Sequence, residues 1–218
     1  TMLFLSTWLI LIKKNKEIDI NFEDYSPYKF YDKETVNIEN DGFVQPYGDV
    51  PYTYENVSES IYLHLIQRAN KYCYITTPYL IIDDNILNSL ISASKQGVDV
   101  RILLPHIPDK KIVFDLSRSY YKRLINAGVK IYEYIPGFVH SKMFIVDDIF
   151  ATVGTVNLDY RSLYLHMECG TFMYKCSSIN DMKKDFLSSL KVSKEITKIE
   201  YNKLSKGRRL YWAILRLF

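Results

Sequence analysis

The sequence predicts an α/β fold, in which helices cover a β-sheet, and three observations lead to it. Hydrophobic residues make up 48% of the 218 residues, which fits a globular chain with a buried core and excludes a disordered one. From Gly42 onward, strand-like and helix-like segments alternate along the chain. At one place two strands joined by a tight turn interrupt this alternation. An α/β sheet with one inserted hairpin accounts for all three observations.

The expected elements begin with an extended segment at residues 43–47. Gly97 and Gly128 each follow a run of helical spacing and are expected to end a helix. A further helical pattern starts at about Ser178. Between these points we expect a helix at 55–70, a strand at 72–76, a helix at 83–97, a strand at 98–104, a helix at 109–128, a strand at 129–135, a hairpin of strands at 142–148 and 149–154, and a strand at 168–174.

Composition divides the chain into three parts. Residues 1–41 open with a 12-residue apolar run, which is too short to span a bilayer, and continue as a polar, acidic stretch typical of a connector. Residues 42–195 hold the alternating elements and are expected to form the domain. Residues 196–218 are expected to form a basic, amphipathic tail.

The tail carries the positive charge of the protein. Residues 203–218 hold five basic residues and no acidic one, which leaves 23 basic against 25 acidic residues in the rest of the chain. Nucleic-acid binders normally carry positive charge on the folded domain. We therefore expect an anionic membrane surface, and no nucleic acid, as partner.

On a helical wheel the tail separates into two faces. Its apolar face holds Leu204, Tyr211, Ile214, Leu215 and Phe218, and its basic face holds Lys206, Arg209 and Arg216. Such a helix suits a membrane interface. The alternative is a terminal helix docked on its own domain.

The hairpin brings together residue types that phosphoryl transfer needs. It lies in the stretch "HSKMFIVDDIFATVGTVN", which begins at His140. Lys142 is two positions later and therefore points to the same side of an extended chain. After the reversal near Asp147, the return strand carries Asn157 back toward His140. An imidazole can attack phosphorus while lysine and asparagine bind its non-bridging oxygens.

Two carboxylates and a glycine have separate expected roles. Asp147 is seven strand residues from His140, roughly 23 Å at about 3.3 Å per residue. It is therefore expected to anchor the turn and not to touch the imidazole. Glu168 begins the next strand, where its carboxylate can bond one ring nitrogen of His140 and leave the other free. Gly154 is expected to let the backbone approach a ligand.

Six positions of the hairpin stretch match the HKD motif of the phospholipase D superfamily: H-x-K, four residues, D, six residues, then G-T-x-N. Three segments, "TTPYLIIDDNIL", "RSYYKRLINAGVKIYEYIPGFVHSKMFIVDD" and "GTVNLDYRSLYLHMECG", resemble the carboxyl-terminal half of bacterial cardiolipin synthases. The similarity runs from about Gly42 to the end of the chain. His166 departs from it, since those enzymes often have asparagine there.

This resemblance implies a mixed β-sheet flanked by helices on both faces, and a site assembled from two HKD motifs. One histidine would carry the phosphatidyl group, and the other would protonate the departing glycerol and then deprotonate the incoming hydroxyl. Donor and acceptor would both be phosphatidylglycerol, at the cell membrane, with the catalytic domain facing the cytoplasm. No cofactor is implied, and no cysteine or histidine spacing suggests a metal. The implied catalytic residues are His140, Lys142, Asp147, Asn157 and Glu168.

No other histidine of the chain is followed two positions later by lysine, so a second motif is missing. The opening "TMLFLSTWLILIKKNKE" resembles the segment just after the first motif of full-length synthases. We therefore expect a synthase half whose residues 1–41 connect to a missing amino-terminal half, and which alone is weakly active or inactive. The alternatives are a single-motif phosphodiesterase or nuclease that acts as a homodimer, and an inert binding half. His140 is compatible with either histidine role, nucleophile or general acid.

Overall fold

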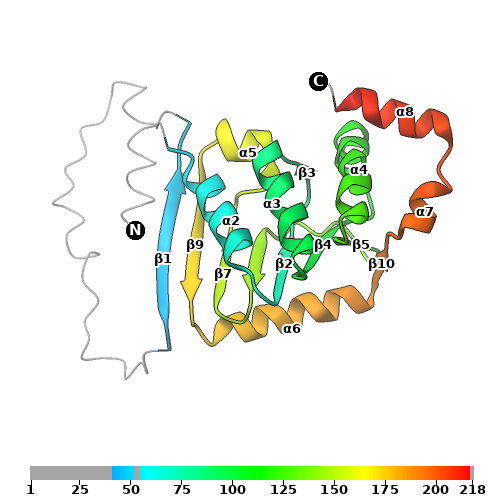
Figure 1. Cartoon of the computed structure of the whole chain (residues 1–218). Helices are drawn as coiled ribbons and strands as arrows, with labels where there is room; N and C mark the ends of the chain where they lie inside the picture. The colour runs from blue at the N-terminus through cyan, green and yellow to red at the C-terminus, as the bar shows by residue number, and fades with distance from the viewer. Residues whose placement is uncertain (1–40, 52–54, 217–218) are drawn as a thin grey trace, which may run out of the picture.

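The protein is built on an eight-stranded mixed β-sheet with helices on both faces, which confirms the predicted fold class (Figure 1). This computed structural model describes residues 41–51 and 55–216, so nearly all of the expected connector lies outside it. Across the sheet the strands follow the order β1-β9-β7-β6-β2-β4-β5-β10. Their bounds are β1 Phe43–Asp49, β2 Tyr72–Thr76, β4 Asp99–Pro105, β5 Lys130–Tyr134, β6 Met143–Val146, β7 Phe150–Gly154, β9 Glu168–Tyr174 and β10 Ser193–Glu195.

Parallel and antiparallel pairing occur in different parts of the sheet. Strands β2, β4 and β5 run parallel, because a helix carries the chain back between each of them. On one side of them the neighbours pair antiparallel, with the β6–β7 hairpin next to β2 and then β9 and β1, and on the other side β10 pairs antiparallel with β5. Strand β1 closes one edge of the sheet and β10 closes the other.

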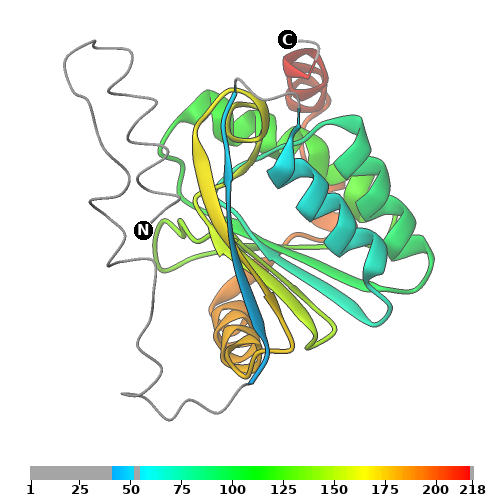
Figure 2. The same cartoon turned by 90° about the vertical axis from the view of Figure 1, so that its left-hand side faces the viewer.

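The helices lie in two layers. Helices α2, α3 and α4 cover one face and α6 covers the other (Figure 2). Their bounds are α2 Val57–Arg68, α3 Asp84–Lys95, α4 Lys111–Asn126 and α6 Ser178–Lys191. Their ends follow the sequence signals: the side chain of Asp83 caps α3 by accepting from the backbone N–H of Ile86 at 2.7 Å. Gly97 and Gly128 adopt φ of 98° and 100° just after α3 and α4.

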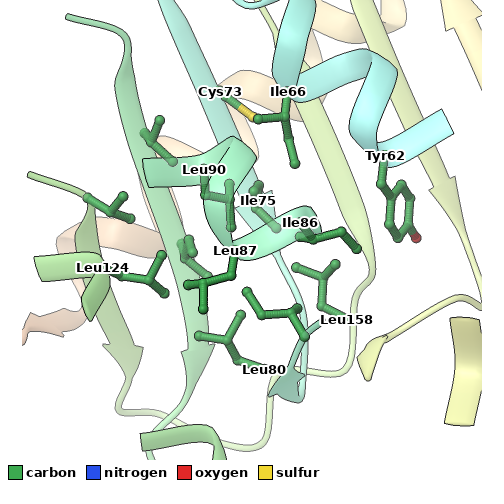
Figure 3. Packing of buried hydrophobic residues seen from close by; sticks show 14 of the residues in the cluster. Tyr62, Ile66, Cys73, Ile75, Leu80, Ile86, Leu87, Leu90, Leu124 and Leu158 are labelled. Atoms are coloured by element: carbon green, nitrogen blue, oxygen red, sulfur yellow. The ribbon is translucent and has the colours of Figure 1, made fainter. Parts of the chain in front are cut away.

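A hydrophobic core lies on each side of the sheet. Under α2, α3 and α4, fully buried aliphatic side chains such as Ile66, Ile75 and Leu87 pack against one another (Figure 3). On the other face Tyr74 stacks on Phe186 of α6, with 4.9 Å between ring centroids. Successive residues of β2 thus serve opposite cores. Each such buried side chain contributes roughly 1.5–3 kcal/mol through removal of apolar surface from water.

A buried carboxylate ties α4 to β5. The Glu133 side chain is fully buried and accepts from Arg118 Nε at 2.8 Å and Nη2 at 2.6 Å. His106 Nδ1 lies 2.7 Å from the same carboxylate, and Tyr121 donates to it at 3.2 Å. The charge is therefore compensated on both oxygens.

The shortest elements were not expected from the sequence. Strand β3, Leu80–Ile81, pairs in parallel with β8, Leu158–Asp159, in a two-stranded sheet. Helices α5, Tyr160–Tyr164, and α7, Lys198–Asn202, have five residues each. A two-residue strand and a five-residue helix are too short to show a hydrophobic period, and tertiary contacts decide them.

The carboxyl-terminal tail is docked on the domain. It forms α7 and then α8, Lys206–Leu215. Trp212 is 2% exposed, and its indole N–H donates to Asp115 of α4 at 2.9 Å. The apolar face expected from the helical wheel is divided: Leu204 and Leu215 pack against the core, whereas Tyr211 and Ile214 face outward, and Phe218 lies outside the described residues. None of the helices in the described part of the chain is long and apolar enough to cross a bilayer.

Candidate active site

The β6–β7 hairpin reverses through a turn with two left-handed residues. Asp147 and Asp148 have φ of 55° and 59°, and the N–H of Ile149 donates to the carbonyl of Val146 at 2.9 Å. Aspartate tolerates this conformation better than most residues because its short side chain can bond locally. The turn therefore suits the "DD" pair at this point of the sequence.

Asp147 anchors this turn to the start of β2. Its carboxylate accepts from the backbone N–H groups of Asn70 at 2.7 Å, Lys71 at 2.9 Å and Tyr72 at 2.7 Å. It is not among the residues that line the pocket around His140. The structure thus gives Asp147 an anchoring geometry, as strand length led us to expect.

His140 and Lys142 lie together in the extended segment that enters β6. The Lys142 ammonium is 2.6 Å from the carbonyl oxygen of His140 and about 3 Å from both ring nitrogens, at 2.9 and 3.0 Å. Partial desolvation of the imidazole, in a residue that stays exposed, and then the Lys142 charge hold the pKa of His140 below its ordinary value of 6.5. Burial also lowers the pKa of Lys142, which Glu168 and Asp159 partly offset. The site thus favours a neutral imidazole beside a buried cation.

Asn157 faces the same pocket as His140. Its Nδ2 is 3.0 Å from the hydroxyl oxygen of Ser162, and its Oδ1 is buried without a hydrogen-bond partner among the described residues. Because the two ends of an amide are assigned from their neighbours, a half-turn of this group would let its carbonyl accept from Ser162. The NH₂ would then occupy the buried position that has no partner among the described residues, as a donor available to a ligand that reaches it.

Glu168 contacts His166 and not His140. One carboxylate oxygen lies 3.1 Å from His166 Nδ1, and the other accepts from the hydroxyl of Thr155. The bond that we expected between Glu168 and His140 is therefore not formed in the structure, because both oxygens have nearer partners. His166 is two positions before Glu168, so the alternation that paired His140 with Lys142 was also the signal for this pair.

Gly154 serves the sheet and not a ligand, contrary to our expectation. A Cβ at this position would lie 2.6 Å from the Cα of Gly170 in β9. The close approach is therefore between the backbones of β7 and β9. This packing brings Thr155 and Glu168 within hydrogen-bonding contact.

His140, Asn157 and Glu168 line one pocket of about 450 Å³. It opens at the end of the sheet where β2 and β4 finish, which is where ligands commonly bind in α/β sheets. Lys110 and Arg161 add positive charge to its walls, and neither was expected from the sequence. The volume lies in the range of small-ligand sites. A phosphate ester would meet an imidazole and at least two cations there.

A larger pocket of about 790 Å³ lies between β1 and α2 and holds His64 but none of the motif residues. Within residues 41–51 and 55–216, no three histidine, cysteine or acidic residues gather closely enough to hold a metal ion. The motif pocket is therefore the candidate active site.

Comparisons with known proteins show which family the chain belongs to. The family model described as cardiolipin synthase, PLD-like domain, matches residues 62–190. An uncharacterized protein of Streptococcus mutans is 43% identical over 217 residues, which is 100% of this chain and 45% of that protein. A cardiolipin synthase of Halalkalibacterium halodurans is 40% identical over 180 residues, 83% of this chain and 35% of the enzyme. The chain thus spans less than half the length of these relatives.

The fold has a counterpart among solved structures. Nuc from Salmonella typhimurium, a phospholipase D family member, superposes with a TM-score of 0.60 at 18% identity. The match covers 71% of this chain and 100% of that one. The structural match shows the shared fold, whereas the family model and the relatives at about 40% identity lead to the conclusion that this chain belongs to the cardiolipin synthase family of phospholipase D-like domains.

Proposed function

We propose that this chain is one catalytic half of a phosphatidyltransferase that converts two phosphatidylglycerol molecules to cardiolipin and glycerol through a phosphohistidine. The observation that carries the proposal is the His140 imidazole, whose ring nitrogens lie 2.9 and 3.0 Å from the buried Lys142 ammonium, in the wall of a pocket of about 450 Å³. A neutral ring nitrogen can attack phosphorus or exchange a proton with a glycerol oxygen. A cation held next to it stabilises the charge that develops on the non-bridging oxygens.

The proposed reaction needs two imidazoles. A ring nitrogen of the first forms a bond to phosphorus, and the bond from phosphorus to the glycerol headgroup breaks. The second imidazole protonates the departing glycerol oxygen. It then takes the proton from a hydroxyl of the second phosphatidylglycerol, whose oxygen displaces the histidine from phosphorus and forms cardiolipin. His140 supplies one of these two imidazoles.

The other residues of the site bind and position. Lys142 and the NH₂ of Asn157 would bind the non-bridging oxygens, because Lys142 lies against the His140 ring and Asn157 lines the same pocket as His140. Asp147 would act at a distance, by fixing the hairpin that carries His140. Glu168 would orient His166 in the pocket wall and, through its charge, help to keep Lys142 protonated.

The second imidazole would come from another HKD motif. We propose that it belongs to an amino-terminal half of the same enzyme, because the relatives are more than twice as long as the part of them that this chain matches. The 218 residues alone would then show little or no synthase activity, since general acid–base help is commonly worth 100- to 10,000-fold. The complete enzyme would work on anionic lipid at the cytoplasmic face of the cell membrane.

Complementation tests the proposal. The amino-terminal half of a close relative, supplied as a separate chain or by fusion, should restore cardiolipin formation from phosphatidylglycerol vesicles. His140→Ala should abolish it, whereas His64→Ala, in the other pocket, should retain it. Lys142→Ala and Asn157→Ala should each reduce the rate by roughly 100-fold or more. Near-normal turnover by the His140 variant would exclude the assignment.

The same assay assigns the role of His140. Phosphatidylglycerol labelled with ³²P at its phosphate should transfer the label to whichever chain holds the nucleophilic histidine. Denaturation without acid preserves the phosphoramidate bond, so that the labelled chain can be identified. Label on this chain makes His140 the nucleophile. Label on the amino-terminal half, with loss of turnover in the His140 variant, makes His140 the general acid.

The alternative is a single-motif phosphodiesterase or nuclease in which two copies of His140 share one site. The observation in its favour is that 100% of the Salmonella family member Nuc is matched by 71% of this chain. It requires a dimer that is active without any added half. Sizing in solution, together with an activity assay on the chain alone, separates the two proposals.

A further inference from the structure

The helix α8 exposes an apolar stripe to solvent. Leu210, Tyr211 and Ile214 are 63%, 44% and 46% exposed. They lie three, four and seven positions after Gly207, so they share one face of the helix. Isolated apolar side chains on a surface need no explanation, but three neighbours on one terminal helix do.

Docking fixes the direction of this stripe. Trp212 lies on the opposite side of α8, where it is buried and bonded to Asp115 of α4, and Leu215, at the edge of the stripe beside Tyr211, packs partly buried against the core. Arg216 lies over the ring of Tyr120, also in α4, at 5.4 Å from its centroid. The helix is thus held by its inner side. Its outer side covers nothing among the described residues.

Basic side chains border the stripe. Lys206 and Arg208 are exposed, one at each flank of the apolar face, and Lys203 is exposed just before α8. Residues 203–216 contain no aspartate or glutamate. An apolar stripe between cations complements the anionic headgroups and acyl boundary of a membrane surface.

The stripe lies at the same end of the molecule as the candidate active site. The first turn of α4 contributes Val113 to the wall of the motif pocket, and Asp115 in the next positions holds Trp212. Figures 1 and 2 both show α8 at the upper end together with α5, which also lines the pocket, whereas α6 lies at the lower end. One helix, α4, therefore separates the pocket from the stripe.

We propose that the outer face of α8 is a docking surface for an anionic lipid bilayer, which holds the mouth of the motif pocket toward the lipid. The orientation half of this statement rests on the proposed function, since it matters only if the substrate is a lipid. The binding half does not, because the stripe and its flanking cations are independent of His140. Nucleic acid is the competing partner for the cations, but it gives no reason for the exposed apolar residues.

Vesicle sedimentation of the 218-residue chain tests the surface. Parent protein should bind vesicles of equimolar phosphatidylglycerol and phosphatidylcholine and bind pure phosphatidylcholine far more weakly. Each basic residue near an anionic surface is worth roughly a fivefold change in partition. Lys206→Gln with Arg208→Gln should therefore weaken binding about 25-fold. Replacing Leu210, Tyr211 and Ile214 together by serine should weaken it at least about tenfold.

The matched control lies at the opposite end of the molecule. Lys184→Gln with Lys191→Gln on α6 removes two exposed cations, and Val192→Ser removes a 49% exposed apolar side chain. These changes should leave vesicle binding within about twofold of the parent. Because all the replaced side chains are exposed, far-ultraviolet circular dichroism should show every variant folded.

The outcomes separate the two proposals. His140→Ala should bind vesicles as the parent does. Binding by the parent without cardiolipin formation in the complemented assay would overturn the proposed function and support this surface. Three results would overturn the docking surface and leave the catalytic proposal standing. They are an equal loss of vesicle binding in the α6 control, no preference for phosphatidylglycerol, and a loss of duplex DNA binding, in place of lipid binding, in the α8 variants.

Discussion

Asp147 offers the sharpest test of how the motif works, because the structure makes it an anchor. Three backbone N–H groups at the start of β2 donate to its carboxylate, at 2.7, 2.9 and 2.7 Å. Asp147→Ala removes all three bonds and leaves a side chain that resists the left-handed backbone at φ 55°. We expect a loss of stability and not a direct loss of chemistry.

The size of this loss follows from the contacts. These donors lie near solvent, so each bond is taken as about 1 kcal/mol net, at the low end for a charged acceptor. The strained backbone adds about 1 kcal/mol for alanine. The free energy of unfolding should therefore fall by about 4 kcal/mol, and the melting midpoint by roughly 8–16 °C for a chain of this length. Asp147→Asn tolerates the backbone and keeps one acceptor oxygen, so it should cost about 2 kcal/mol.

Urea unfolding followed by circular dichroism measures these values, with an unchanged m-value as evidence that only stability differs. Asp148→Asn is the matched control, because it shares the turn and the left-handed backbone. The Asp148 carboxylate accepts from the side chains of Lys183 and Tyr72, and water can replace it as the acceptor. Asp148→Asn should therefore lower the free energy of unfolding by less than about 1 kcal/mol. If Asp147→Ala unfolds like the parent, or if Asp147→Asn is stable but inactive in the complemented assay, the anchoring role is wrong.

Four further predictions concern the site and the sheet. Lys142→Met should raise the pKa of His140 toward 6.5, measured by NMR titration, because it removes a neighbouring cation. In the parent, turnover that needs neutral His140 should fall as the pH drops through the lowered pKa of His140. Activity of the complemented enzyme should survive thorough chelation, and restoration by an added divalent ion after a loss would contradict the proposed mechanism. Glu133→Gln should lower the free energy of unfolding by about 3 kcal/mol, because it breaks a fully buried charge network. Gly154→Ala should lower the melting temperature without changing the His140 titration, because its methyl group would meet the backbone of β9.

The longer helices and strands could be predicted from the sequence and the shortest ones could not, for a physical reason. Strands and helices such as β4 and α4 extend over enough residues to show a hydrophobic period. Gly97 and Gly128 marked the ends of α3 and α4. Strand β3 has two residues, and its pairing with β8 depends on a contact between residues about 80 positions apart. No local pattern encodes such a contact.

Side-chain pairing in the site was less predictable than its position. The motif spacing brought His140 and Asn157 to one pocket, because strand geometry is regular. The partner of Glu168 was decided by which donors reached it in three dimensions, and these were Thr155 and His166. Arg161, in α5, and Lys110, at the start of α4, line the pocket from separate elements, which spacing alone does not align. Likewise, helical periodicity predicted that the tail is amphipathic. It did not predict which side of the tail helix packs against the domain.

The two strands that close the sheet have a practical consequence for solubility. The family match ends at residues 62 and 190 and thus leaves out both β1 and β10. A chain cut to those limits would lose the pairing partners of β9 over seven residues and of β5 over three. Open edges of this kind template pairing with another molecule. We therefore expect the unit that stays monodisperse in solution to be wider than the unit that sequence similarity outlines, and to include both Phe43 and Glu195.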